Sequence, residues 1–164
     1  YILSAGRSGR DYGTLFAAVN GLDIVVHIVC DRDAALAGLK IPDNVAVLRD
    51  CYDRDYMDQL RNCLFVVVPL SVHDISAGQM VLLQAMAFEK ASIVSKTETI
   101  EEYVREGVES LLVEQGNVSA LRDAIHRLLQ HEPLMARLAI NGRRSFEEKF
   151  SMAAYVRQLV AAVG

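Results

Sequence analysis

The sequence lacks features that would place it in several common classes. It carries 17 lysines and arginines against 21 acidic residues, a net charge of −4, so a basic surface for non-specific nucleic-acid binding is not expected. A phosphate-bearing ligand would have to be held by a few well-placed cations. No apolar run approaches the roughly 18 residues that span a membrane, and no signal peptide is visible.

The cysteines are few and poorly placed for metal binding. Cys30, Cys51 and Cys63 are odd in number and lack metal-ligand spacing. We therefore expect no metal site and predict reduced, mostly buried thiols in a cytoplasmic protein. Because the chain opens inside a strand-like run at Tyr1, we also expect it to be a piece of a longer protein.

Six short apolar runs alternate with helical stretches. The strand candidates are Ile2–Ala5, Ile24–Cys30, Val45–Leu48, Leu64–Pro69, Ser92–Ser95 and Ser110–Val113. Continuous rather than alternating apolar runs are typical of strands buried on both faces of a parallel sheet. Residues 1–164 therefore predict one α/β domain, a doubly wound Rossmann-like sheet of about six strands with helices on both faces.

Capping residues predict where the helices begin and end. The predicted N-caps are Asp11, Asp53 or Asp55, Thr99, Asn117 and Ser151, with Pro133 opening a further helix and Gly21 and Gly107 closing two. Two amphipathic faces are expected to point inward: Val118, Leu121, Ile125, Leu128 and Leu129 in one helix, and Met152, Tyr155, Val156, Leu159 and Val163 in the last.

The stretch from Pro69 to Lys96 reads as loop, helix and strand after a buried strand. In parallel sheets, ligands sit where such strands end. Ser76 and Gln79 resemble a capping box, and Gly78 would let an anion approach the backbone N–H groups of the first turn. The alternative is a well-capped core helix in which Gly78 serves packing.

Four stretches together resemble the C-terminal, donor-binding domain of group 1 glycosyltransferases (family 4, GT-B fold). They are Ser4–Arg7 ahead of Asp11–Leu15; Tyr56–Leu60 followed by Leu64–Pro69; Leu82–Ala87 followed by Ser92–Ser95; and Glu102–Gly107, Leu111–Val113 and Asn117–Leu129. The resemblance implies a site for a UDP-, GDP- or ADP-sugar donor, with the acceptor bound by an N-terminal lobe outside this chain. It implies no cofactor and no metal, and it leaves open whether the full-length enzyme works at the inner face of the membrane.

The resemblance carries over to the basic residues only in part. Arg7 matches the family's phosphate-binding arginine, whose guanidinium can hold a diphosphate and stabilise the leaving group. The alternative is a surface ion pair with Asp11. The family's next cation, a lysine, aligns with Tyr12, and Arg10 is expected either to supply that contact or to be a solvated loop residue.

The family's two glutamates are also changed. The second aligns with Gln84, which can still hydrogen-bond a ribose hydroxyl. The first would fall at Ser76, or near His73 and Asp74 if the loop is counted forward from Pro69. We take Asp74 as the candidate for contact with the donor sugar and His73 as its neighbour; a plain polar loop is the alternative for both.

Further candidates line the expected donor site. Gly78 and Gln79 would present backbone N–H groups to the diphosphate. Tyr52 could stack on the nucleobase, with a plain turn after the third strand as the alternative. Glu102 matches a residue that the family uses near the sugar, although a capping box with Thr99 would also explain it. No residue is assigned to proton transfer.

Three hypotheses about function follow. The first is the donor-binding domain of a sugar transferase that acts in polysaccharide or glycolipid assembly and is inactive in isolation. The second is a non-catalytic nucleotide-binding or interaction module of the same fold. The third, a dinucleotide-binding or receiver-like domain, is disfavoured because Gly6–Arg10 does not match G-x-G-x-x-G.

Overall fold

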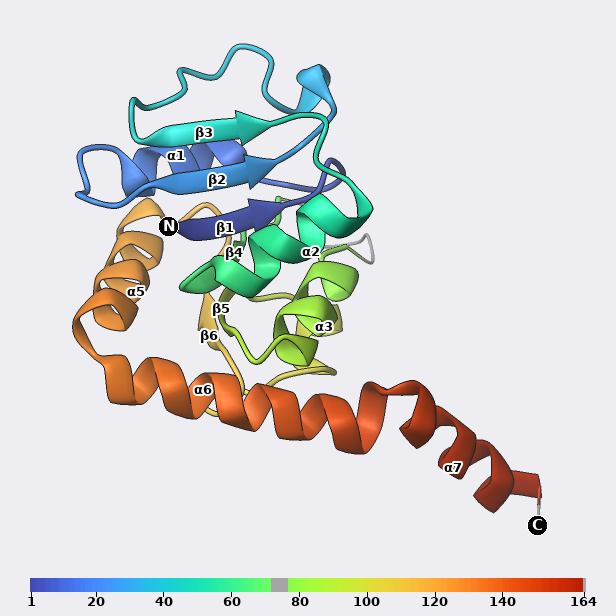
Figure 1. Cartoon of the computed structure of the whole chain (residues 1–164). Helices are drawn as coiled ribbons and strands as arrows, with labels where there is room; N and C mark the ends of the chain where they lie inside the picture. The colour runs from blue at the N-terminus through green and yellow to red at the C-terminus, as the bar shows by residue number, and fades with distance from the viewer. Residues whose placement is uncertain (72–76, 164) are drawn as a thin grey trace.

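The computed structural model describes residues 1–71 and 77–163 and shows an α/β domain (Figure 1). The strands are β1 Ile2–Ala5, β2 Val26–Val29, β3 Val45–Leu48, β4 Phe65–Val68, β5 Ala91–Ser95 and β6 Leu111–Val113. The helices are α1 Tyr12–Val19, α2 Asp53–Asn62, α3 Gln79–Ala87, α4 Glu98–Glu101, α5 Val118–Gln130, α6 Glu132–Ser145 and α7 Met152–Val163, with a 3₁₀ turn, η1, at Asp33–Ala35 and a π-helical turn, η2, at Phe146–Phe150.

The six strands form one parallel sheet in the order β3-β2-β1-β4-β5-β6. All six predicted strands are confirmed, with the second shortened to Val26–Val29, the fourth to Phe65–Val68 and the sixth to Leu111–Val113, and with the fifth beginning at Ala91. The chain winds outward from β1 to β3 and then returns to β4 on the other side of β1. The topological switch point therefore lies between β1 and β4, where ligands of doubly wound sheets bind at the carboxyl ends of the strands.

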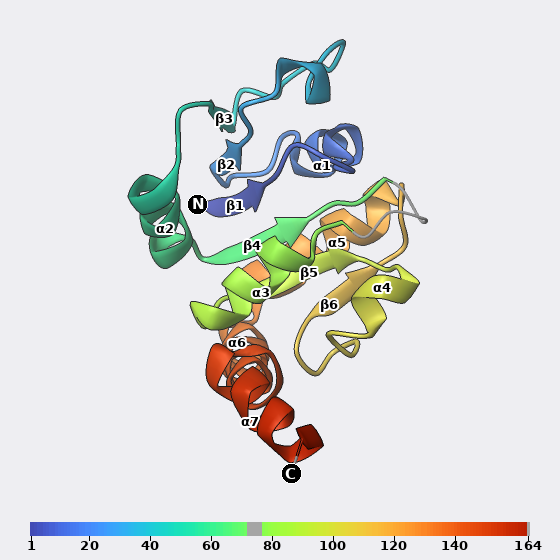
Figure 2. The same ribbon diagram turned by 90° about the vertical axis from the view of Figure 1, so that its right-hand side faces the viewer.

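Helices cover both faces of the sheet, as the sequence predicts. Figure 2 shows α1 and α5 on one side and α2 and α3 on the other. Alternate strand residues divide between two buried clusters: Ile2 faces the side of α1, α5 and α6, whereas Leu3 faces α2, α3 and α4. Burial on both faces explains why the strands read as continuous apolar runs.

Helix capping matches the sequence at three sites and differs at others. The side chains of Asp11, Asn117 and Ser151 accept from the backbone N–H groups of Thr14, Ala120 and Ala154 as predicted. Helix α2 begins at Asp53, but Tyr52 is its N-cap and no side chain caps it.

Two predicted capping boxes are wrong. Helix α3 begins at Gln79 with Gly78 as its N-cap, so a cap at Ser76, which lies outside the described residues, does not open it. In α4 the cap is Thr97, two residues before Thr99, and its hydroxyl accepts from Ile100 N–H. Gly107 does not end α4, which stops at Glu101; its N–H donates to the Ser110 carbonyl in a later turn.

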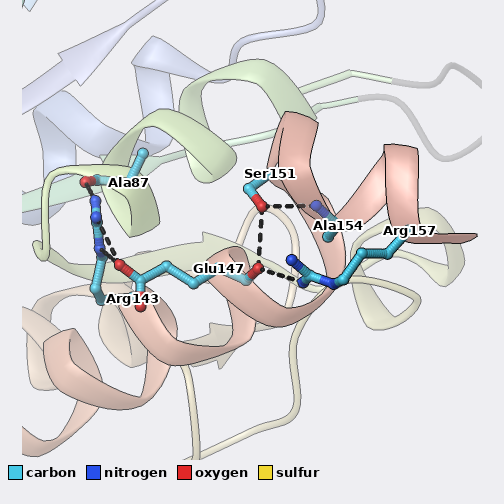
Figure 3. A network of polar contacts seen from close by, with 6 residues as sticks. All are labelled: Ala87, Arg143, Glu147, Ser151, Ala154 and Arg157. Carbon is cyan, nitrogen blue, oxygen red and sulfur yellow. Dashed lines mark hydrogen bonds and ion pairs between the residues drawn. The ribbon is translucent and has the colours of Figure 1, made fainter.

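The far end of α3 is held by a polar network on α6 and the turn that follows (Figure 3). Arg143 donates to the carbonyl of Ala87, the last residue of α3, and pairs with Glu147 at 2.6 Å. The Glu147 carbonyl accepts from Ser151 Oγ at 3.0 Å and from Arg157 at 3.4 Å. Helix α3, whose N-terminus lies at the switch point, is therefore held at its C-terminus by residues of α6 and the segment that follows.

The two predicted inward faces are only partly buried. In α5, Leu121, Ile125 and Leu128 are buried together with Ala124, but Val118 and Leu129 are exposed. In α7 the prediction is wrong for all four predicted residues whose burial is described, since Met152, Tyr155, Val156 and Leu159 are exposed and Ala154 is buried instead. The reason is position: α7 runs out beyond the sheet in Figure 1 and packs mainly against the turn η2 that precedes it.

Within the described residues, none of the helices combines the length and the apolar character that crossing a membrane requires.

Position 78 requires glycine for two reasons, its left-handed backbone conformation and the lack of room for a Cβ. Its φ is +87°, and a Cβ would lie 3.0 Å from Val68 Cγ1 and 3.1 Å from Leu70 Cδ2. We expect Gly78→Ala to lower the free energy of unfolding by about 2–3 kcal/mol, the sum of a left-handed conformation and overpacking. Gly21→Ala is the matched control, because Gly21 has φ +75° but nothing within 4 Å of its Cβ position; it should cost about 1 kcal/mol. Equal losses in urea titrations of the two variants would contradict the packing role.

Candidate functional site

Two loops meet at the switch point and are hydrogen-bonded to each other. One follows β1 and the other follows β4. Ser71 N–H donates to the Gly9 carbonyl and Asp11 N–H donates to the Pro69 carbonyl, both at 3.1 Å, and Arg10 pairs with Leu70 in an isolated antiparallel bridge. The path of the chain after β1 is therefore fixed by the chain after β4.

Arg10 folds back over the first of these loops. Its Nε donates to the Ala5 carbonyl at 2.8 Å and its Nη1 to the Ser8 carbonyl at 3.1 Å. A Cβ on Gly6 would lie 2.5 Å from Arg10 Nη2, so the guanidinium needs glycine there. Burial lowers the pKa of Arg10 from its ordinary value. The expectation of a solvated loop residue is wrong; Arg10 is a brace, and it is not among the residues that line the cavity described below.

Tyr12, which aligns with the family's lysine, is almost fully buried. Its hydroxyl donates to the Gly6 carbonyl at 2.5 Å, and burial raises the pKa of the phenol. At this position the chain therefore has a neutral group that holds the loop after β1 rather than a cation that could reach a ligand.

A cavity of about 330 Å³ opens at the carboxyl ends of β1, β2 and β3, between α2 and α3. It is lined by Ala5, Gly6, Arg7, Val29, Asp31, Arg49, Cys51, Tyr52, Asp53, Tyr56, Val81 and Gln84. The structure thus brings together three of the predicted site residues, Arg7, Tyr52 and Gln84, from three separate parts of the sequence.

Asp31 joins two of the cavity's side chains. Its Oδ2 accepts from Arg7 Nη1 at 3.1 Å and from the Tyr52 hydroxyl at 3.3 Å. Partial desolvation and the neighbouring Asp31 carboxylate raise the pKa of Tyr52. The ion pair that was the alternative for Arg7 therefore exists, but with Asp31; Asp11 is occupied by capping α1.

These rim contacts are weak enough to be exchanged. The side chain of Arg7 is 65% exposed, and ion pairs at such sites contribute at most about 1 kcal/mol. Arg49 forms a similar pair with Asp33 at 2.8 Å. A ligand carrying more than one negative charge could therefore draw Arg7 away from Asp31 at small cost.

Gln84 enters the cavity from the second turn of α3. Its Oε1 accepts from the hydroxyl of Tyr56, on α2, at 2.8 Å. Burial raises the pKa of Tyr56 to about 12, so the phenol keeps its proton at neutral pH. The amide nitrogen of Gln84 has no hydrogen-bond partner within the part of the chain that the structure describes.

The remaining candidates lie elsewhere or are not described. Gly78 and Gln79 form the N-terminus of α3 beside the loop after β4, so their N–H groups stay candidates for an anion. Glu102 is exposed at the end of α4 and lines no part of the cavity. His73 and Asp74 lie outside the described residues, so their predicted contact with the sugar stays a prediction.

Sequence reasoning missed Asp31 and Tyr56. Asp31 follows the second strand, and the rule that side chains after parallel strands converge at one sheet edge could have found it. Tyr56 gave no such signal, because its reach to Gln84 depends on how α2 packs beside α3. Among the described residues no group of three or more His, Cys, Asp or Glu side chains is arranged to hold a metal ion.

Comparison with known proteins decides the family. Residues 33–145, more than half of the chain, match the profile of the glycosyl transferases group 1. The chain belongs to this family. One relative is an uncharacterized glycosyltransferase of Methanocaldococcus jannaschii, 34% identical over 92 residues that make up 56% of this chain and 25% of the relative.

Solved structures share the fold of this group 1 chain at low sequence identity. HepE of Anabaena in complex with UDP and glucose superposes with a TM-score of 0.80 at 17% identity, over 99% of this chain and 48% of HepE. The C-terminal domain of a group 1 family protein, LpcC, from Francisella tularensis gives 0.74 at 17% identity, over 93% of this chain and 87% of that domain. The chain thus spans about half of HepE, and these matches confirm the predicted Rossmann-like α/β fold.

The brace formed by Arg10 can be tested by stability. We expect Arg10→Lys to lower the free energy of unfolding by about 1–3 kcal/mol, because a single ammonium nitrogen must replace Nε and Nη1, which reach the Ala5 and Ser8 carbonyls from two positions of a planar fork. Arg137→Lys, on the exposed surface of α6, should change it by less than about 0.5 kcal/mol. A loss at Arg10 no larger than at Arg137, in urea denaturation, would show that Arg10 is not a brace.

Proposed function

We propose that this chain is the donor-binding half of a glycosyltransferase and that the cavity between α2 and α3 holds the nucleoside of a nucleotide-diphosphate sugar. The observation that carries the proposal is the place of that cavity: it lies beside the switch point of a group 1 glycosyl transferase domain, with Arg7 at its rim. Its volume, about 330 Å³, falls within the range of about 300–1,000 Å³ usual for small-molecule sites.

The distribution of groups around the cavity suits each part of such a donor. Tyr52 offers an exposed ring for the base, and Gln84 a hydrogen-bonding amide for the ribose. Arg7 and the backbone N–H groups at the start of α3 would face the diphosphate from two sides. The helix N-terminus is fixed in position and Arg7 extends from a fixed loop, so together they would stabilise charge that develops on the leaving diphosphate without a metal ion.

The base and the acceptor remain to be identified by experiment. Because HepE of Anabaena was solved with UDP and with UDP-glucose, a uridine nucleotide is the first donor to test. The proposed reaction moves the sugar from the nucleotide to an acceptor, in polysaccharide or glycolipid assembly in the cytoplasm. It needs an acceptor lobe outside this chain, so the isolated 164-residue chain should bind donor without turning it over.

The second candidate is a nucleotide-binding module that has lost catalysis. Two observations favour it: a neutral, buried Tyr12 stands at the family's lysine, and an amide, Gln84, at one of its carboxylates. Donor consumption by the full-length protein supports the enzyme, whereas donor binding without consumption supports the module.

Calorimetric titration with UDP, GDP and ADP tests the donor site. We expect one nucleotide to bind saturably and Arg7→Ala to weaken it by at least about 1 kcal/mol, roughly fivefold, through loss of a charge-assisted hydrogen bond. Arg137→Ala, which removes the same charge from the exposed face of α6, should leave the dissociation constant within twofold. If no nucleotide binds the chain or the full-length protein, the donor site does not exist.

Asp31 should oppose diphosphate binding. Because its carboxylate pairs with Arg7, we expect Asp31→Asn to tighten inorganic pyrophosphate binding by about three- to tenfold at low salt, within the range of surface charge effects. Asp43→Asn makes the same charge change in an exposed loop before β3, at the opposite edge of the sheet, and should have little effect. Weaker binding by the Asp31 variant would mean that Asp31 holds Arg7 in its binding position.

A further inference from the structure

Tyr56 and Gln84 form a hydrogen-bonded pair in the wall of the cavity. The two side chains reach toward each other from α2 and α3, and both line the cavity. The Tyr56 hydroxyl donates to Gln84 Oε1 at 2.8 Å, so the carbonyl side of the amide already has a strong partner. The donor side, Nε2 with its two protons, has no partner among the described residues and is the side open to a ligand.

The hydrogen bond from Tyr56 to Gln84 does not depend on pH in the neutral range. A phenol has one proton to give, and burial raises the pKa of Tyr56 to about 12. Tyr56 therefore keeps the proton that it donates to Gln84 Oε1 throughout the neutral range. A free glutamine side chain can present either oxygen or nitrogen by rotating its terminal amide, whereas a glutamine that accepts from Tyr56 presents nitrogen.

We propose that Tyr56 is a positioning residue that fixes the Gln84 amide with its N–H groups toward the cavity, so that the chain recognises a ribose hydroxyl through its oxygen as acceptor. This inference rests on the proposed function, since it requires that the nucleoside of the donor occupies this cavity. A carboxylate at position 84 could only accept; the pair of Tyr56 and Gln84 reverses the direction of the hydrogen bond and removes a negative charge from the site.

The ribose, rather than the base, is the part that Gln84 meets. Gln84 lies in the second turn of α3, whose N-terminus faces the loops that would hold the diphosphate. The ribose is bonded directly to the diphosphate, so it comes closer to the start of α3 than the base does. Tyr52, the N-cap of α2, lines the part of the cavity formed by Arg49 and Cys51 after β3. We therefore place the base beside Tyr52.

A double-mutant cycle on the 164-residue chain tests the inference. The variants are Tyr56→Phe, Gln84→Met and the two combined, each titrated with UDP, with 2′,3′-dideoxyuridine diphosphate and with inorganic pyrophosphate. If the titrations with UDP, GDP and ADP identify another base, the matching nucleotides are used. Tyr103→Phe, which removes a tyrosine hydroxyl from a partly buried ring packed on Phe150, is the control.

We expect Tyr56→Phe to weaken UDP about fivefold, because the amide then rotates freely, and Gln84→Met to weaken it by about as much or more. The double variant should be no weaker than Gln84→Met, since the two residues act through one hydrogen bond. Binding of the dideoxy nucleotide and of pyrophosphate should stay within twofold in all variants.

Failures of the two proposals are distinguishable. If the unchanged chain binds UDP but Tyr56→Phe leaves its affinity unaltered, or weakens all three ligands alike, the positioning role is wrong while the donor site stands. If the effect of Tyr56→Phe persists with the dideoxy nucleotide, Gln84 does not meet the ribose. If neither the chain nor the full-length protein binds any nucleotide, the donor site and this inference fall together.

Discussion

The attachment of the loop after β1 to the loop after β4 is the constraint on which the site depends. These strands are neighbours in the sheet but are separated by about sixty residues of chain. Two backbone hydrogen bonds and the fold-back of Arg10 onto the Ala5 carbonyl tie the loops together. The position of Arg7 follows from this, because it lies between Gly6, which the Arg10 guanidinium covers, and Ser8, whose carbonyl Arg10 holds.

The cations near the switch point have separate tasks. Arg10 stabilises the fold, because its guanidinium lies over Gly6 and donates to two backbone carbonyls. The hydroxyl of Tyr12 donates to the carbonyl of the same glycine. Arg7, by contrast, is exposed and held only by a weak surface ion pair. A rigid loop thus carries one exchangeable guanidinium. In the proposed donor site only the Arg7 side chain has to move to meet the ligand, while the loop that carries it stays in place.

Much of the fold could be predicted from the sequence because it depends on local patterns. Continuous apolar runs gave all six strands, and Asp11 and Asn117 capped their helices as expected. The misses concern tertiary surroundings. The periodicity of apolar residues in α7 predicts a buried face. Tyr155 and Val156 on that face are nevertheless exposed in the described chain. Helix α3 begins at Gln79 with Gly78 as its N-cap, at a position where Val68 and Leu70 leave no room for a Cβ, and a capping pattern does not report such crowding.

The candidate site shows the same division. Arg7, Tyr52 and Gln84 could be placed together from motif order and the rule that loops after parallel strands share one edge. The role of Arg10 could not, since the choice between solvent and fold-back depends on a glycine four residues earlier. Nor could the contact between Tyr56 and Gln84, which follows from the packing of α2 beside α3. Both contacts are made by long side chains, whose hydrogen-bond partners depend on tertiary packing and not on spacing in the sequence.

The most direct test of the account is a crystal structure of the chain with UDP. The account predicts the uridine in the cavity between α2 and α3, with Tyr52 against the base, Gln84 Nε2 at a ribose oxygen and the diphosphate between Arg7 and the N-terminus of α3. A nucleotide bound elsewhere, for example in the smaller cavity of about 270 Å³ beside Gly13, Phe16 and Leu39 on α1 and the loop before β3, would contradict the central claim.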